Sequence, residues 1–159
     1  VQLFFCTGNR CDTSKHAKKP AFLARLLGPD ALPTLVKTRK RPLVTVGPEK
    51  VIVGWRRRDD YPCFESDVEL TDEELEIFWS HYDRKNGFPT RGDKLLGWPN
   101  WIQDENYPSC PICGEEIYCN LFQVASEDNL PYMFGDVGNG WIFLCTKHPD
   151  QVTFRWDCY

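Results

Sequence analysis

The sequence has no long hydrophobic run. A membrane-spanning helix needs roughly 18 or more consecutive apolar residues, whereas the longest apolar runs here, such as Trp141–Cys145, have the length of a strand. No signal peptide opens the chain as it is given. Hydrophobic residues still make up 42% and aromatic residues 14% of the 159 residues, which is a globular and not a disordered composition. We therefore expect a folded domain without a membrane segment.

Catalytic motifs are missing as well. The chain contains no phosphate-binding glycine-rich loop, no HExxH and no GxSxG. Its three histidines are His16 in a basic segment, His81 in a predicted helix and His148 in a predicted metal pair, and none is flanked by a nucleophile motif. Of the acidic runs, we expect Asp59–Asp60 to close a turn and Asp72–Glu74 to begin a helix. These absences predict no enzyme activity, and no small-molecule substrate is inferred.

Eight cysteines are present, an even number that fits either a disulfide framework or metal ligands. A chain of this length buries enough surface to fold without cross-links. Cys110 and Cys113 lie in the sequence Cys-Pro-Ile-Cys-Gly, a spacing typical of metal binding in a reducing compartment. We therefore predict metal-binding thiols and a cytoplasmic location.

The chain starts at Val1 without an initiator methionine, directly in a strand-like run. A tag scar, native processing or excision from a longer protein would each explain this start. We treat residues 1–159 as a single domain, which in the last case is a fragment of a longer chain.

Charge is divided unevenly along the chain. The basic N-terminal part, residues 1–58, holds 13 Lys/Arg against 3 Asp/Glu, a balance of +10. The acidic C-terminal part, residues 59–159, holds 6 against 20, a balance of −14, and the two add to the net charge of −4. This predicts either two parts of one domain that attract each other or a bipolar surface with two kinds of partner.

The predicted fold class is α+β, mainly antiparallel β with one clear helix. Short apolar and β-branched runs predict strands at Val1–Cys6, Leu43–Val46, Val51–Trp55, Ile117–Val124, Trp141–Cys145 and Val152–Trp156. The second and third of these runs are expected to form a hairpin through the turn at residues 47–50.

The clear helix is predicted over residues 71–85. Thr71 and Glu74 have the spacing of a capping box, and one apolar face follows at helical spacing, formed by Leu75, Phe78, Trp79 and Tyr82. A second, short helix is predicted at Ala21–Leu27, because Gly28 is a typical C-terminal stop.

Two segments of the chain resemble each other. Residues 2–7 align with residues 141–146, and three positions are identical: Phe4 with Phe143, Cys6 with Cys145 and Thr7 with Thr146. Each copy reads as a strand that ends in a cysteine at a turn. The match predicts an internal duplication, although short strand matches also arise by chance.

The best-defined candidate site consists of Cys110, Cys113, Cys145 and His148. Two pairs with two-residue spacing supply four soft or borderline ligands, a set that suits tetrahedral zinc. One pair precedes a predicted strand and the other follows the next one. If those strands are antiparallel neighbours, all four ligands meet at one end of the sheet. Four protein ligands leave no open position, so we predict a structural zinc ion and not a catalytic one.

Alternatives to this ligand set remain. Cys158 is a second candidate for the fourth ligand in place of His148, and the cysteines are free or buried thiols if no metal binds. A second site would use Cys6, Cys11 and Cys63. Cys119 is expected to belong to the core.

A basic and aromatic group precedes the acidic part of the chain. Arg56–Arg58 follow Trp55, and further basic residues lie at Lys37, Arg39, Lys40 and Arg41. Such residues bind phosphates and stack on bases in nucleic-acid-binding proteins. A solvated strand edge that discourages aggregation has the same composition, and we prefer that interpretation.

Several short motifs occur in order towards the C-terminus: Gly92–Gln103, Cys110–Gly114, Leu121–Gln123, Gly135–Asp136, Phe143–Pro149 and Trp156–Cys158. Together they resemble the bacterial YwqG-like family of unknown function. Val1–Cys6 also looks like an element of that family, normally found inside a longer chain, and residues 12–90 match loosely.

The YwqG-like family is similar to the programmed-cell-death-2 type proteins, which are linked to ribosome biogenesis and to chaperoning of ribosomal proteins. The resemblance implies a mostly antiparallel β fold with internal pseudo-repeats and no established reaction. Bacterial members are also discussed as immunity proteins. We therefore expect a non-enzymatic protein-binding module, chaperone-like or immunity-type. The alternatives are an RNA-binding or ribosome-biogenesis-linked domain that uses the basic N-terminal part, and a hydrolase at Gly97–Pro99.

Overall fold

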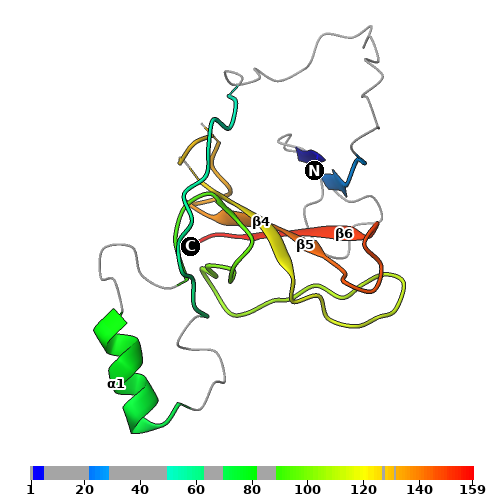
Figure 1. Cartoon of the computed structure of the whole chain (residues 1–159). Helices are drawn as coiled ribbons and strands as arrows, with labels where there is room; N and C mark the ends of the chain where they lie inside the picture. The colour runs from blue at the N-terminus through cyan, green and yellow to red at the C-terminus, as the bar shows by residue number, and fades with distance from the viewer. Residues whose placement is uncertain are drawn as a thin grey trace, which may run out of the picture.

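A computed structural model describes residues 2–5, 22–28, 50–62, 70–81, 89–126, 128–130 and 132–159. Its main element is a four-stranded antiparallel sheet in the order β3-β4-β5-β6 (Figure 1). The strands are β3 (Lys94–Leu95), β4 (Asn120–Ala125), β5 (Asn139–Leu144) and β6 (Val152–Asp157). Each strand pairs with the next one along the chain, so the last three form a simple meander.

This architecture confirms the predicted class, mainly antiparallel β with one helix. The three C-terminal strands were predicted, with boundaries that differ by at most three residues. The segment predicted as a strand from Ile117 joins β4 only at Asn120, because Ile117 still belongs to the preceding loop. The short strand β3 was not predicted, since its surroundings are rich in glycine and proline.

Alternating side chains of β5 enter two apolar clusters, one on each face of the sheet. Trp141 and Phe143 are fully buried on one face, in a cluster with Cys110, Ile117 and Cys145. Ile142 points to the other face, in a cluster with Val124, Phe134 and Phe154. A strand buried on both faces explains why β5 reads as a continuous apolar run.

Strands β1 (Gln2–Phe5) and β2 (Phe22–Arg25) form a separate antiparallel pair. Phe22 packs edge-on against Phe154, with ring centroids 5.4 Å apart, so this pair covers the face of the second cluster. The strand predicted at Val1–Cys6 is thus confirmed. The helix predicted at Ala21–Leu27 is wrong, because a short apolar run fits a strand equally well and pairing with β1 selects the strand.

The helix α1 (Asp72–His81) begins as predicted. Glu74 accepts hydrogen bonds from the backbone N–H and the hydroxyl of Thr71, and the Thr71 hydroxyl accepts one from the Glu74 N–H in return. This is the capping box read from the sequence. Figure 1 shows α1 at the end of the molecule away from β1 and β2. The helix end predicted near Lys85 lies outside the described residues.

The stretch predicted as a strand at Val51–Trp55 is not one. Residues 50–62 contain no helix or strand, and Figure 1 shows them as a long cyan trace that passes beside the sheet. We call Lys50–Arg58 the exposed strip, because every residue in it is exposed. Its predicted hairpin partner, Leu43–Val46, lies outside the described residues.

The exposed strip is attached to the sheet through side chains. Trp55 packs edge-on against Phe122 of β4, with ring centroids 6.0 Å apart. Just beyond the strip, the Asp60 carboxylate accepts hydrogen bonds from the backbone of Thr90 and Trp98 and forms a salt bridge of 2.8 Å with Lys94. Asp60 is therefore an anchor, and not the turn residue that was predicted.

The segment between β3 and the metal-ligand loop is held by a buried amide. The Gln123 side chain accepts hydrogen bonds from the Asn100 backbone and from the Trp141 indole, and it donates one to the Gly92 carbonyl, each at 2.8 Å. Gly97 has a φ of +83°, and a Cβ there would meet the Asp60 carboxylate at 2.3 Å, so glycine permits this close approach.

In the described part of the chain, no helix has the length and hydropathy needed to cross a membrane.

Candidate metal centre

The first ligand pair lies on a tight loop that precedes β4. The loop closes where the Gly114 N–H donates to the Cys110 carbonyl at 2.9 Å and the Cys110 N–H donates to the Glu115 carbonyl at 2.8 Å. Gly114 has a φ of +75°, which a residue with a side chain rarely adopts. This geometry turns Cys110 and Cys113 to the same side of the loop, as the Cys-Pro-Ile-Cys-Gly pattern predicts.

The second ligand pair lies in the connection between β5 and β6. Cys145 directly follows β5, and its backbone pairs with Gln151 just before β6. Within this connection the His148 N–H donates to the Cys145 carbonyl at 3.2 Å. The turn therefore brings the imidazole of His148 back over the thiol of Cys145.

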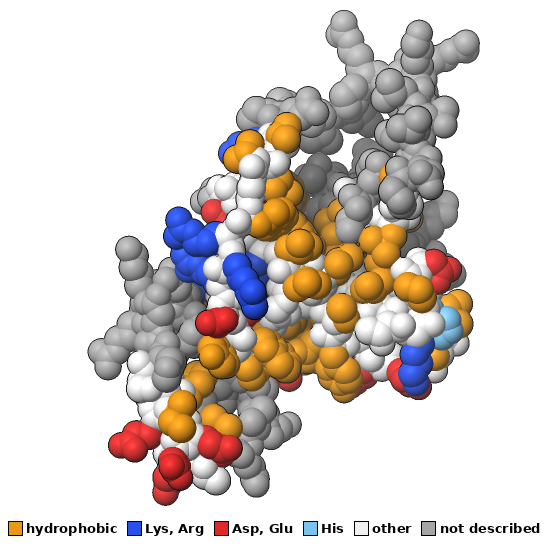
Figure 2. Space-filling view, in the orientation of Figure 1, with side chains coloured by type: hydrophobic (Ala, Val, Ile, Leu, Met, Phe, Trp, Pro, Cys, Tyr) orange, Lys and Arg blue, Asp and Glu red, His pale blue; other side chains and the backbone are white. Residues whose placement is uncertain are grey.

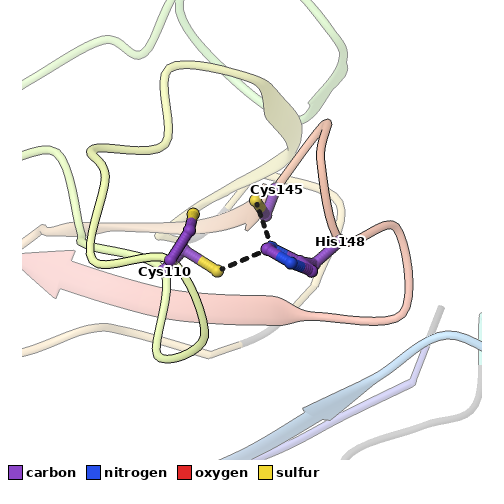
Figure 3. A group of neighbouring side chains, drawn as sticks. Cys110, Cys145 and His148 are labelled. Carbon is purple, nitrogen blue, oxygen red and sulfur yellow. Dashed lines mark hydrogen bonds between the residues drawn. The ribbon is translucent and has the colours of Figure 1, made fainter.

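The four predicted ligands lie together. Their ligand atoms are all within 4.8 Å of one another, and Figure 3 shows the side chains of Cys110, Cys145 and His148 pointing towards a common centre. The Nδ1 of His148 lies 3.6 Å from the Sγ of Cys110 and 3.6 Å from the Sγ of Cys145. For tetrahedral zinc, bonds of about 2.3 Å to sulfur and 2.0 Å to nitrogen give an S···N separation of about 3.5 Å, close to these distances. The arrangement therefore fits a Cys₃His metal site.

Neighbouring groups shift the pKa values of two of the thiols. Burial raises the pKa of Cys110, but backbone hydrogen bonds from Cys113 and Ile112 and the Cys145 thiol more than offset it and bring the pKa down to about 6. A backbone hydrogen bond from Glu115 lowers the pKa of Cys113, yet burial and the neighbouring sulfurs outweigh it and raise the pKa overall. Adjacent thiolates repel one another, and a divalent cation would remove that repulsion.

The site adjoins the apolar cluster on its own face of the sheet. Cys110 and Cys145 are buried beside Trp141 and Phe143, and Cys113 packs at the edge of the same cluster. On the solvent side, Lys147 forms a salt bridge with Glu115 that joins the two ligand loops. Both partners of this pair are more than half exposed, so solvent screens their attraction. The ligand group is thus buried against apolar side chains on the sheet side, while Cys113 and His148 are half-buried.

Of the cysteines in the described ranges, Cys119 and Cys158 do not join this cluster. The alternative fourth ligand, Cys158, directly follows β6, next to Asp157, which pairs with Asn139 at the start of β5. Cys145 lies at the opposite end of β5, so the ligand group contains His148 and not the alternative Cys158. Cys119 is half-buried just before β4 and not within it.

The second site considered from the sequence falls on residues that the structure does not describe. Cys6, Cys11 and Cys63 lie outside the described residues, as does His16. The five described cysteines are all free thiols.

Sequence reasoning missed the two polar side chains that position the site's surroundings, Gln123 and Asp60. Gln123 is fully buried, and a glutamine in the middle of an apolar strand is the signal that could have identified it, because a buried amide needs partners. Asp60 carried no comparable signal, since its partners are distant in sequence.

One comparison with known proteins identifies a family. A family model described as a domain of unknown function, DUF1963, matches residues 33–158, a range that contains all four candidate ligands. No curated protein and no solved structure gives a significant match. The matched range covers most of the chain, so this chain belongs to the DUF1963 family.

Proposed function

We propose that this chain is a non-catalytic protein-binding module, chaperone-like or immunity-type, whose fold is stabilised by a structural zinc ion. The observation that supports the structural ion is the group of four ligand atoms within 4.8 Å of one another, all supplied by protein side chains. Such a set fills the tetrahedral positions of zinc and leaves none for a substrate. A closed site of this kind stabilises a fold and does not activate water.

Exposed apolar side chains support the binding role. Leu95, Leu96 and Trp98, in the segment anchored by Gln123 and Asp60, are each about half exposed. Figure 2 shows apolar side chains gathered across one face of the molecule. Exposed apolar patches of this kind mark interaction surfaces. The resemblance to YwqG-like and programmed-cell-death-2 type proteins supports the same role and a cytoplasmic location.

Co-purification from the native source at endogenous level tests the binding role. We expect a protein partner in stoichiometric amount, retained by the wild-type chain and lost with Trp98→Ala and Leu96→Ser. A variant of the exposed Tyr159 to Ala is the matched control for removing apolar surface elsewhere. Repeated recovery of the wild-type chain alone would reject the protein-binding role.

A second candidate function is RNA binding, in line with a link to ribosome biogenesis. The observation that favours it is the row of exposed arginines at Arg56–Arg58 beside the half-exposed Trp55. Phosphate contacts weaken steeply with salt. Retention on immobilised RNA should therefore fall between low and physiological salt, and the absence of retention at low salt removes this candidate.

A further inference from the structure

We propose that the exposed strip, Lys50–Arg58, is a docking strand to which an acidic, extended peptide segment of a partner protein adds by β-strand pairing. This inference deepens the protein-binding role proposed above and rests on it. It names the chemistry of the partner and adds a second contact surface to the exposed side chains Leu95, Leu96 and Trp98.

The backbone of the exposed strip is unpaired. Among the hydrogen bonds of the described part of the chain, none uses the backbone N–H or C=O of residues 51–58. These residues run past the sheet as an open trace without helical coiling (Figure 1). A row of free donors and acceptors on an uncoiled backbone is what an added strand requires.

The composition of the exposed strip favours a strand over a loop. Val51, Ile52 and Val53 are β-branched residues, which have high strand propensity, and they are 79%, 61% and 99% exposed. Surface loops seldom present such a run to water, because burying it is favourable. An added strand would cover these side chains and satisfy the backbone at the same time.

The exposed strip is also held in place at its C-terminal end. Trp55 packs on Phe122, and Asp60 receives two backbone hydrogen bonds and the Lys94 salt bridge. A segment that is already positioned loses less conformational entropy on binding than a free one. These anchors prepare the strip for docking without covering its exposed side chains.

The positive charge of the exposed strip favours a negatively charged partner peptide. The strip carries Lys50, Arg56, Arg57 and Arg58, all exposed, against the neighbouring Asp59. Figure 2 shows Lys and Arg side chains gathered on the side of the molecule where the cyan trace runs in Figure 1. A basic row beside an apolar run fits a peptide that alternates carboxylates with apolar side chains. Single-stranded RNA fits less well, since Val51–Val53 provide no surface for base stacking.

The test uses the full chain and a pool of short fluorescent peptides in which glutamate alternates with randomised apolar residues. We expect binding that weakens with salt. The same peptides methylated on alternate backbone nitrogens keep their charge and side chains but cannot pair as strands, so their affinity should fall about tenfold or more.

Two variants of the chain separate backbone from charge. Val53→Pro removes one N–H and should weaken peptide binding about tenfold, while the control Val53→Ala keeps that N–H and should weaken it much less. Replacing Arg56, Arg57 and Arg58 together by glutamate should abolish binding at low salt. Circular dichroism and thermal unfolding of each variant establish that it remains folded.

Three results would overturn the docking strand: no binding by the peptide pool at low salt, equal affinity of the methylated peptides, or displacement of bound peptide by single-stranded RNA at lower concentration than by unlabelled peptide. If a native partner co-purifies yet still binds Val53→Pro and the triple glutamate variant, the protein-binding role stands and the docking strand does not.

Discussion

At the scale of single residues, Gln123 is a fully buried side chain that hydrogen-bonds three separate segments. Gln123→Leu keeps a similar volume but leaves the Trp141 indole N–H, the Asn100 N–H and the Gly92 carbonyl without their partner. Unpaired buried polar groups are costly, so we expect the free energy of unfolding to fall by about 2–4 kcal/mol. Chemical denaturation measures this loss. Gln103→Leu, which removes one exposed hydrogen bond, should cost less than about 1 kcal/mol; an equal loss in both variants would contradict the role given to Gln123.

Asp157 should make stability depend on pH. Burial raises the pKa of this carboxyl to about 6, although backbone hydrogen bonds from Gln103 and Ile102 oppose the shift. Because the folded pKa lies above the unfolded value of about 3.9, the folded state holds the proton more tightly. The contribution of Asp157 to stability is therefore present below about pH 4 and is lost as pH rises through 6.

Asp157→Asn should remove this dependence. Relative to wild type, the variant should gain stability as the pH rises from 4 to 7, measured by thermal unfolding across that range. Asp150→Asn, which removes an exposed carboxylate, controls for the change in net charge. A difference between Asp157→Asn and wild type that stays constant with pH would rule out a raised pKa at this position.

At the scale of elements, Asp60 anchors the segment that carries the exposed strip. Asp60→Ala removes the hydrogen bonds to Thr90 and Trp98 and the Lys94 salt bridge, so we expect faster trypsin cleavage after Arg56–Arg58. The neighbouring Asp59→Ala is the matched control and should leave cleavage unchanged. Mass spectrometry identifies the sites. Acceleration at Arg155 in β6 to the same degree would mean that the whole fold, and not the anchor, had been weakened.

The elements also show where sequence reasoning succeeds. The start of α1 was predictable because Thr71 and Glu74 are three residues apart and satisfy each other. Strand β5 was predictable because burial on both faces produces a continuous apolar run, and β6 because its apolar residues alternate with polar ones. The ligand set was predictable from two short spacings and the expectation that neighbouring antiparallel strands bring the pairs together, and the structure places β4 beside β5.

The incorrect predictions share one physical cause, because each depended on which segments lie side by side in the folded chain. The run at Phe22–Arg25 fits a helix or a strand, and pairing with β1 decides between them. Val51–Trp55 has strand propensity but no strand beside it in the described part of the chain. Cys158 likewise could be separated from the ligand group only once the position of β6 was known, because β6 places Cys158 at the end of the sheet opposite Cys145. The internal pseudo-repeat stays a prediction.

At the scale of the whole molecule, the uneven charge of the sequence can be compared with the salt bridges of the described residues. The salt bridges Lys94–Asp60 and Lys147–Glu115 both lie within the acidic part, residues 59–159. They therefore do not supply the attraction between the basic and acidic parts that was one interpretation of the sequence. The exposed arginines of the strip agree with the other interpretation, a bipolar surface, and both interpretations stay predictions.

The candidate metal centre brings together parts of the molecule that are far apart in sequence. Cys110 and Cys113 precede β4, whereas Cys145 and His148 connect β5 to β6. A bound ion therefore cross-links the loop that covers one face of the sheet to the meander itself. When the free ion is present at 100 times its dissociation constant, binding stabilises the folded state by about 2.7 kcal/mol. Loss of the metal should therefore lower the stability of the whole sheet.

The most direct measurement is elemental analysis of metal per chain, on protein purified without metal-affinity resin, for wild type, Cys110→Ser and the control Cys119→Ser. We predict one zinc per chain in wild type and in Cys119→Ser, and its loss in Cys110→Ser together with a fall of about 3 kcal/mol in the free energy of unfolding. Fully reduced, folded wild-type protein that contains no zinc, or zinc that is retained in Cys110→Ser, would contradict the account and leave these cysteines as core thiols.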